Sequence, residues 1–346
     1  MSPAPIQTEA LVIGAGPVGL FQVFQLGLQG IHCHVVDALP HVGGQCAELY
    51  AGKPIYDIPG IPFCTGLELV ERLQQQIAPF KPTLHLGQQV GQVERLPDQR
   101  LQITTDSGRT FIAPTLFIAA GVGAFVPRRM ALEGLDAFDG TQVFAEHPVP
   151  ERWADQHLVV AGDGDAALQT CLSASEGPLA AATVTLLHRR DQFTAAPELI
   201  AHMRQACAEG RMRFVAGQPT GLRSAQGRLQ ALALLNPQGE TEWLSLDVLQ
   251  TCLGLSPKLG PVAQWGLAMA RKQLVVNTEN FATSEPGIFA VGDINTYPGK
   301  KKLILCGFHE ATLAAFGAVA LLRPEEKTLL QYTTTSTLLH QRLGVA

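Results

Sequence analysis

Three glycines near the start of the sequence have the spacing of a dinucleotide-binding turn. Gly14, Gly16 and Gly19 form G-x-G-x-x-G after the apolar residues 10–13 and before a helix-like stretch. In this pattern the first glycine turns the chain, the second lets the backbone approach a pyrophosphate, and the third lets helix and strand pack closely. The amides at the start of the helix then face the phosphates. The motif predicts a nucleotide site, and the alternative is a tight strand–helix turn without a ligand.

An acidic residue at the end of the next predicted strand supports this site. Asp37 follows the apolar residues 34–36 and comes eighteen residues after Gly19. A carboxylate at this place can accept hydrogen bonds from both hydroxyls of a ribose. Because like charges repel, Asp37 also predicts a nucleotide without a 2′-phosphate.

A second motif of the same kind occurs about halfway along the chain. Gly162, Gly164 and Ala167 form G-x-G-x-x-A, a variant that often accompanies NADP, after the apolar residues 157–161. Two strand–glycine-loop–helix units in one chain predict two nucleotide-binding domains.

The strand after the second motif ends in basic residues. His188, Arg189 and Arg190 stand where the first unit carries Asp37. Two guanidinium groups suit a 2′-phosphate, because each can make a bidentate, charge-assisted contact. We therefore expect the second domain to bind NADPH in preference to NADH. The alternative is a solvated basic strand end.

Apolar and turn-forming segments indicate the elements that position these motifs. They predict a turn-rich region at residues 40–66, followed by a helix at about 66–79 and a hairpin at 100–108. They also predict buried strands at 115–121 and 287–293 and a C-terminal helix at about 308–322.

Composition and charge exclude several classes of protein. A chain of 346 residues is long for one core and sufficient for two domains. The net charge of −5 gives no indication of nucleic-acid binding. Residues 1–8 carry no basic region of a signal peptide, and the apolar residues 311–322 are too few to span a bilayer. We expect a cytoplasmic protein that does not bind membranes.

The cysteines predict neither a disulfide framework nor a metal site. The chain has seven, and no two of them lie within three residues of each other. Such a scattered, odd set lacks the C-x-x-C spacing of zinc and redox motifs, so we expect most of these thiols to be buried apolar groups.

Several longer segments resemble one family of flavoproteins. Residues 43–50 and 56–60 resemble the early FAD-domain segment of the thioredoxin-reductase-like flavoproteins. Residues 283–293 resemble their second FAD motif, and residues 188–195 resemble their NADPH-phosphate segment. The resemblance extends over nearly the whole chain.

Within that superfamily the chain most resembles the bacterial ferredoxin–NADP⁺ reductases of the thioredoxin-reductase-like type. Residues 140–156 contain no C-x-x-C, where thioredoxin reductases carry their redox pair. Residues 297–302 match the Tyr-Pro-Gly-Lys-x-Lys segment of these ferredoxin reductases, and residues 332–340 resemble their C-terminal extension.

The resemblance implies an α/β fold with two Rossmann-like, three-layer nucleotide-binding domains. An FAD-binding domain would comprise residues 1–122 and 283–346, and an NADPH-binding domain would be inserted at residues 123–282. Hinges are expected near residues 121–125 and 280–284.

The same resemblance implies roles for particular residues at FAD. Asp37 would bind the adenosine ribose, and Val90 would contact the adenine through its backbone. Gln45 and Tyr50 would lie at the flavin end, with Tyr50 stacked on the isoalloxazine.

Three later residues complete the implied FAD site. Phe125 would lie near the flavin, and Asp293 would contact the ribityl–pyrophosphate portion. Thr334, on the C-terminal extension, would cover the flavin of its own subunit or of the partner in a homodimer.

The implied function is FAD-dependent electron transfer between NADPH/NADP⁺ and ferredoxin or flavodoxin. A hydride would pass to the flavin, and single electrons would then leave it. One alternative is a flavin disulfide reductase of the thioredoxin-reductase type, which the missing C-x-x-C disfavours. The other is a non-catalytic regulatory protein that binds NADPH and FAD.

Two further groups of residues bear on these alternatives. Cys46 lies in a segment similar to the redox-disulfide region of lipoamide dehydrogenases, but no second cysteine follows about five residues later, so we expect a packed thiol. Residues 300–302, all lysine, and Arg128 with Arg129 are candidate contacts for an acidic ferredoxin. The alternative is that they are solvated loop charges.

Overall fold

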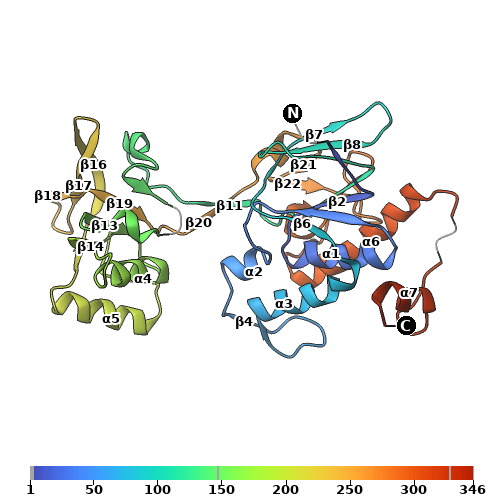
Figure 1. The fold of residues 1–346 in the computed structure, drawn as a ribbon, viewed down its shortest axis with the longest axis horizontal. Coiled ribbons are helices and arrows are strands. Elements are labelled where there is room, and N and C mark those ends of the chain that lie inside the picture. The colour runs from blue at the N-terminus through green and yellow to red at the C-terminus, as the bar shows by residue number, and fades with distance from the viewer. Residues whose placement is uncertain (1–3, 146–147, 327–328, 346) are drawn as a thin grey trace. The chain divides into compact units, whose positions relative to one another are not determined.

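The computed structural model describes residues 4–145, 148–326 and 329–345. Its chain divides into two compact units: unit 1 comprises Met1–Ala124 and Pro257–Ala346, and unit 2 comprises Phe125–Ser256. The chain passes between them along β11 (Ala124–Pro127) and β20 (Leu255–Lys258), which pair as a two-stranded sheet (Figure 1).

The second boundary lies earlier in the chain than residue 283, where the sequence placed it. β22 (Gln273–Val275) pairs in parallel with β24 (Asn295–Thr296), and Leu274 is buried in the core of unit 1. Residues 280–284, the second predicted hinge, are therefore inside unit 1, and the second crossing is next to Ser256 and Pro257.

The central layer of unit 1 is a parallel five-stranded sheet in the order β23-β10-β2-β3-β6. Its strands are Ile288–Ala290, Thr115–Ile118, Ala10–Ile13, Cys33–Val36 and Thr83–His85. Most of their side chains are apolar and buried, as a sheet covered on both sides requires. The strand order reverses between β2 and β10, and the carboxyl ends of strands at such a switch point are where doubly wound folds bind dinucleotides.

Helices and a second sheet cover the two faces of this parallel sheet. On one side α1 (Pro17–Leu28) packs against α3 (Gly66–Ile77) and α6 (Ile304–Leu322). On the other lies a sheet of order β1-β9-β8-β7, formed by Ile6–Gln7, Thr110–Ala113, Leu101–Thr105 and Val90–Arg95. The β8–β9 pair is the hairpin predicted at residues 100–108.

Helix α6 begins four residues earlier than the sequence predicted. With 19 residues and a mean hydropathy of 1.6 it is long and apolar enough, by length and composition only, to cross a membrane, so the predicted 12-residue limit was wrong. One side of α6, including Glu310, is buried inside unit 1, where the helix packs on α1.

Unit 2 has the same three-layer plan. Its parallel sheet has the order β12-β19-β13-β14-β15, formed by Val143–Phe144, Val248–Thr251, His157–Ala161, Thr183–His188 and Arg213–Ala216. Leu158 and Val160 of β13 face α4 (Asp165–Ala174) and α5 (Pro197–Ala208), whereas Val159 faces the antiparallel strands β16 to β18 at 218–245. The predicted α/β fold with two Rossmann-like domains is confirmed.

Candidate functional site

In the first motif, two of the three glycines are required by the protein's own backbone. Gly14 follows β2 with a φ of +107°, and a Cβ on it would lie 2.4 Å from the carbonyl oxygen of Ala119 after β10. A Cβ on Gly19, inside α1, would lie 1.8 Å from the carbonyl oxygen of Gly14. Any side chain at these positions would force strand and helix apart.

Gly16 lies in an open space. It has an extended backbone with φ −72° and ψ −179°, and the nearest atom to a Cβ built on it is the Gly44 Cα at 3.8 Å. Gly16 is the N-cap of α1, and no described side chain caps the helix. The first-turn amides are therefore available to an anion. The protein's packing does not require a glycine here, whereas a pyrophosphate approaching these amides would.

Asp37 ties the glycine turn to the end of β3. Its Oδ2 accepts a hydrogen bond from the amide of Ala15 at 2.5 Å, and its Oδ1 accepts one from the amide of Leu39 at 2.8 Å. Burial raises the pKa of this carboxyl group, and the two backbone hydrogen bonds oppose that rise. Each carboxylate oxygen has a second lone pair that can accept from a ribose hydroxyl.

Three segments far apart in sequence meet at Gln45 and Asp293. Gln45 is the first residue of α2 (Gln45–Glu48), and its Nε2 lies 3.5 Å from Oδ2 of Asp293 in the 3₁₀ turn η5 (Gly292–Ile294). A Cβ on Gly121, after β10, would lie 3.4 Å from the same Nε2. The structure thus brings together two residues predicted to bind FAD and Gly121, which the sequence predicted only as part of a hinge.

Tyr50 and Val90 have the exposure that their predicted roles need. The Tyr50 side chain is 42% exposed, and the Lys53 Nζ lies 5.7 Å from the centroid of its ring, so a planar ligand would stack on the other face or displace Lys53. The Val90 side chain is buried at the start of β7, so a contact with adenine would have to use its backbone. Phe125 is in β11, but its side chain is outside the described part of the structure.

The C-terminal extension is held at the far end of α1. Arg342 of α7 (Thr337–Leu343) donates a hydrogen bond to the carbonyl oxygen of Leu28, the last residue of α1. The 12 residues of α1 place this end about 18 Å from Gly16. Thr334 is exposed and lies three residues before α7. Its covering of the flavin of its own subunit or of the partner stays a prediction.

The second motif repeats the geometry of the first. A Cβ on Gly162 would lie 2.5 Å from the carbonyl oxygen of Cys252 after β19, and 2.9 Å from the Cβ of Ala167. Gly164, the N-cap of α4, has only the Oγ1 of Thr194 near its Cβ position, at 3.7 Å, and no described side chain caps this helix. Again the middle glycine borders open space at a helix N-terminus.

The basic strand end lies beside this second motif, because β14 is the neighbour of β13 in the sheet. His188 ends β14, and its Nδ1 lies 2.9 Å from the carbonyl oxygen of Arg190. Arg189 and Arg190 are exposed, and neither guanidinium has a partner among the residues that the structure describes. Two unpaired cations here are available to an anionic ligand.

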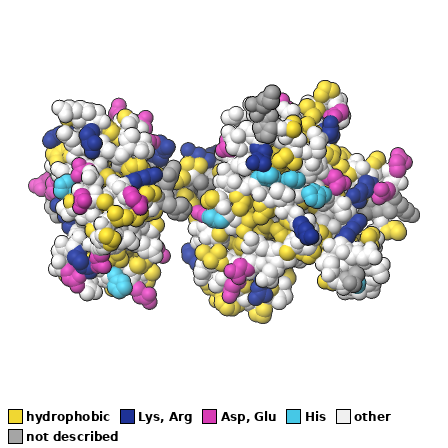
Figure 2. Space-filling model, viewed as in Figure 1, with side chains coloured by type: hydrophobic (Ala, Val, Ile, Leu, Met, Phe, Trp, Pro, Cys, Tyr) yellow, Lys and Arg dark blue, Asp and Glu magenta, His cyan; other side chains and the backbone are white. Residues whose placement is uncertain are grey.

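The candidate docking residues do not form the predicted group. Lys300 is only 7% exposed and is paired with Glu310, so its assignment to a docking surface was wrong. Arg129 pairs with Asp139. Lys301 and Lys302, in unit 1, and Arg128, in unit 2, are exposed. On the face drawn in Figure 2, acidic and basic side chains are interspersed over both units.

Cys46 is a buried free thiol, as predicted. It is 3% exposed, and burial raises its pKa to about 11, with a smaller contribution from the nearby Cys64. Cys64 is a spatial neighbour that the sequence spacing did not reveal. The described residues contain no group of three His, Cys, Asp or Glu side chains able to hold a metal ion.

Comparisons with known proteins agree with this architecture. Residues 8–312 match the pyridine nucleotide-disulphide oxidoreductase family. A ferredoxin–NADP reductase of Acidovorax sp. (strain JS42) is 59% identical over 100% of this chain and 98% of its own length. One from Paracidovorax citrulli is 58% identical over 99% and 97%, respectively.

Two solved structures share the fold at low sequence identity. The bacillithiol disulfide reductase of Staphylococcus aureus has a TM-score of 0.60 at 16% identity, and the thioredoxin reductase of Lactococcus lactis has 0.55 at 21%. Each match covers 91% of this chain and 99% of the other.

Proposed function

The chain belongs to the pyridine nucleotide-disulphide oxidoreductase family and, within it, to the ferredoxin–NADP reductases, and we propose that it transfers electrons between NADPH and ferredoxin. FAD, when bound, supplies the chemistry that links a two-electron hydride donor to one-electron carriers. The protein's residues bind and orient the two dinucleotides.

The observation that carries this proposal is the pair of open glycine turns with opposite charges beside them. Gly16 and Gly164 both border free space at an uncapped helix N-terminus. Asp37 accompanies the first and would repel a 2′-phosphate, whereas Arg189 and Arg190 accompany the second and would attract one. Unit 1 is thus suited to FAD and unit 2 to NADPH.

Within unit 1 the proposed contacts run from the adenosine to the flavin. Asp37 accepts from the ribose hydroxyls, and the backbone of Val90 contacts the adenine. Asp293 and Gln45 bind the ribityl–pyrophosphate portion, and Tyr50 stacks on the isoalloxazine. Their positions support these roles, because Asp37 lies beside the glycine turn and Gln45 contacts Asp293.

The proposed electron acceptor is an acidic one-electron carrier, ferredoxin or flavodoxin. The chain itself has a net charge of −5, so overall attraction cannot bring such partners together. The exposed cations Lys301 and Lys302 of unit 1 are the local contacts that we assign to docking, and Arg128 of unit 2 is a separate candidate. A cytoplasmic homodimer is part of the same proposal.

An anaerobic NADPH titration followed by visible absorbance tests the function. The flavin band of the purified protein should bleach with NADPH and return when oxidised ferredoxin is added. A band that NADPH leaves unchanged would favour a regulatory binding protein. Turnover with thioredoxin but not with ferredoxin would favour a disulfide reductase.

A further inference from the structure

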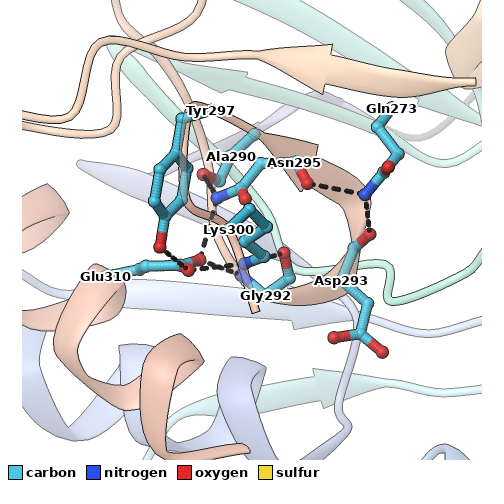
Figure 3. Close-up of polar contacts among 8 residues, drawn as sticks. All are labelled: Gln273, Ala290, Gly292, Asp293, Asn295, Tyr297, Lys300 and Glu310. Carbon is cyan, nitrogen blue, oxygen red and sulfur yellow. Dashed lines mark hydrogen bonds and ion pairs between the residues drawn. The ribbon is translucent and has the colours of Figure 1, made fainter. Parts of the chain in front are cut away.

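A buried ion pair lies directly behind the turn that carries Asp293. Lys300 Nζ is 2.5 Å from Glu310 Oε1, and the two side chains are 7% and 0% exposed (Figure 3). Removing two charges from water is costly, and replacing such a pair by apolar side chains is often neutral or stabilising. Stability alone is therefore a poor reason for this pair.

The pair holds both polar groups of Gly292. Glu310 Oε2 accepts a hydrogen bond from the Gly292 amide at 2.7 Å, and Lys300 Nζ donates one to the Gly292 carbonyl oxygen at 2.9 Å. Gly292 has a φ of +79°, which residues with side chains rarely adopt. It directly precedes Asp293, so the pair fixes the backbone from which that carboxylate projects.

The remaining hydrogen bonds of Glu310 come from the same turn. Asn295 Nδ2 donates to Glu310 Oε2 at 2.8 Å, and the Tyr297 hydroxyl donates to Oε1 at 2.9 Å. Burial, and then the hydrogen bond and charge of Glu310, raise the pKa of Tyr297, so its hydroxyl keeps its proton and donates. Glu310 therefore has four donors, which together specify one geometry, whereas Oδ1 of Asn295 is buried without a partner among the described residues.

A glutamine holds the opposite side of the turn. Gln273 Nε2 donates to the carbonyl oxygens of Asp293, at 3.1 Å, and of Asn295, at 2.8 Å. With the backbone of the turn held from both sides, the Asp293 carboxylate points away from the Glu310 cluster (Figure 3), and its Oδ2 lies 3.5 Å from Nε2 of Gln45 in α2.

We propose that Lys300 and Glu310 are a positioning pair that holds the η5 turn so that Asp293 meets the ribityl–pyrophosphate portion of FAD in its bound geometry. This inference rests on the proposed function, because FAD is the ligand concerned. The pair itself does not contact FAD and acts through Asp293. Of three consecutive lysines, the first thus serves cofactor binding, while Lys301 and Lys302 are exposed.

The test measures FAD affinity of the deflavinated protein by quenching of FAD fluorescence. Lys300→Met and Glu310→Gln should each weaken binding about 10- to 100-fold, the range known for residues that orient a ligand-binding side chain. Lys81→Met is the matched control, the same change at an exposed lysine of unit 1 to which no binding role is assigned, and should leave the dissociation constant unchanged. Wild-type affinity in Lys300→Met would overturn the proposal.

A double-mutant cycle separates positioning from general destabilisation. If Lys300 acts through Asp293, adding Lys300→Met to Asp293→Ala should change FAD affinity little further, because the two effects share one path. Losses that simply multiply would contradict that path and overturn the proposal.

A double variant without either buried charge serves as the control for folding. If either single variant fails to fold, Lys300→Met/Glu310→Gln leaves no lone buried charge. It should still bind FAD more weakly than wild type, and equal binding would overturn the proposal. Failure of the wild-type protein itself to bind FAD would instead refute the proposed function.

Discussion

Gly16→Ala is expected to separate FAD binding from folding. A Cβ at this position has one neighbour within 4 Å, the Gly44 Cα at 3.8 Å, and the backbone at φ −72° and ψ −179° is allowed for alanine. At such a compatible position, replacing glycine by alanine raises the free energy of unfolding by about 0.4–1 kcal/mol. Gly16 is also the N-cap of α1, where alanine is less favourable than glycine by a similar amount. The two effects oppose each other, so the apoprotein should be about as stable as wild type.

The substitution should instead weaken the binding of FAD. A methyl group beside Gly16 occupies the space through which a pyrophosphate would reach the amides of α1. A charge-assisted hydrogen bond lost in this way costs about 1.5–3 kcal/mol, which is roughly a 10- to 150-fold weaker affinity for FAD. Gly19→Ala is the contrasting variant, because its Cβ would lie 1.8 Å from the Gly14 carbonyl oxygen. Overpacking of this kind costs about 1–3 kcal/mol of stability.

The assay combines urea unfolding of the deflavinated variants with FAD titration. Gly16→Ala should move only the dissociation constant, and Gly19→Ala should lower the free energy of unfolding before any ligand is added. If Gly16→Ala bound FAD as tightly as wild type, the pyrophosphate would not lie beside Gly16. If it lost as much stability as Gly19→Ala, the open space inferred beside the turn would be wrong.

Four other variants test the cofactor preference, the role of the thiol and the docking of the partner. Arg189→Ala and Arg190→Ala should each raise the KM for NADPH by roughly 10- to 100-fold, through loss of a charge-assisted contact, and leave the KM for NADH nearly unchanged; equal effects on both would exclude 2′-phosphate recognition. Cys46→Ser should retain most NADPH-dependent ferricyanide reduction, and near-complete loss with FAD still bound would reveal a redox thiol. Lys301→Glu/Lys302→Glu should slow ferredoxin reduction at low ionic strength but not ferricyanide reduction, and the difference should shrink as salt screens charges beyond about 8 Å; a wild-type ferredoxin rate at low salt would place docking elsewhere.

The features predicted correctly from the sequence are those encoded by neighbouring residues. Both glycine turns follow a short apolar strand and precede a helix, and each lies where the strand order of its sheet reverses. The charges of Asp37 and of Arg189 and Arg190 are also local, since each group directly follows the next strand. Such patterns depend on the spacing of a few residues, so they can be recognised without knowing which distant segments pack together.

The features predicted wrongly depend on partners far away in the chain. Residues 257–282 belong to unit 1 because β22 pairs with β24 and Leu274 enters that core, which no local pattern reveals. From the sequence, Lys300 is one of three consecutive lysines and is expected to be solvated. Its partner, Glu310, is ten residues away within a mostly apolar helix, so no local pattern links the two. That isolated carboxylate was the available signal, since a buried glutamate requires a cation or several donors nearby.

The two dinucleotide sites differ in how closely specificity is linked to folding. In the proposed sites the turns at Gly16 and Gly164 would bind a pyrophosphate that both cofactors share, so discrimination would come from the following strand end. In unit 1 the carboxylate of Asp37, proposed to discriminate, also accepts hydrogen bonds from the amides of Ala15 and Leu39, so replacing it would loosen the turn itself. In unit 2 the guanidinium groups of Arg189 and Arg190 have no partner among the described residues, so they do not hold the backbone of the turn. We therefore expect the nucleotide preference of unit 2 to change with surface substitutions, and that of unit 1 to change only with loss of the hydrogen bonds that hold its glycine turn.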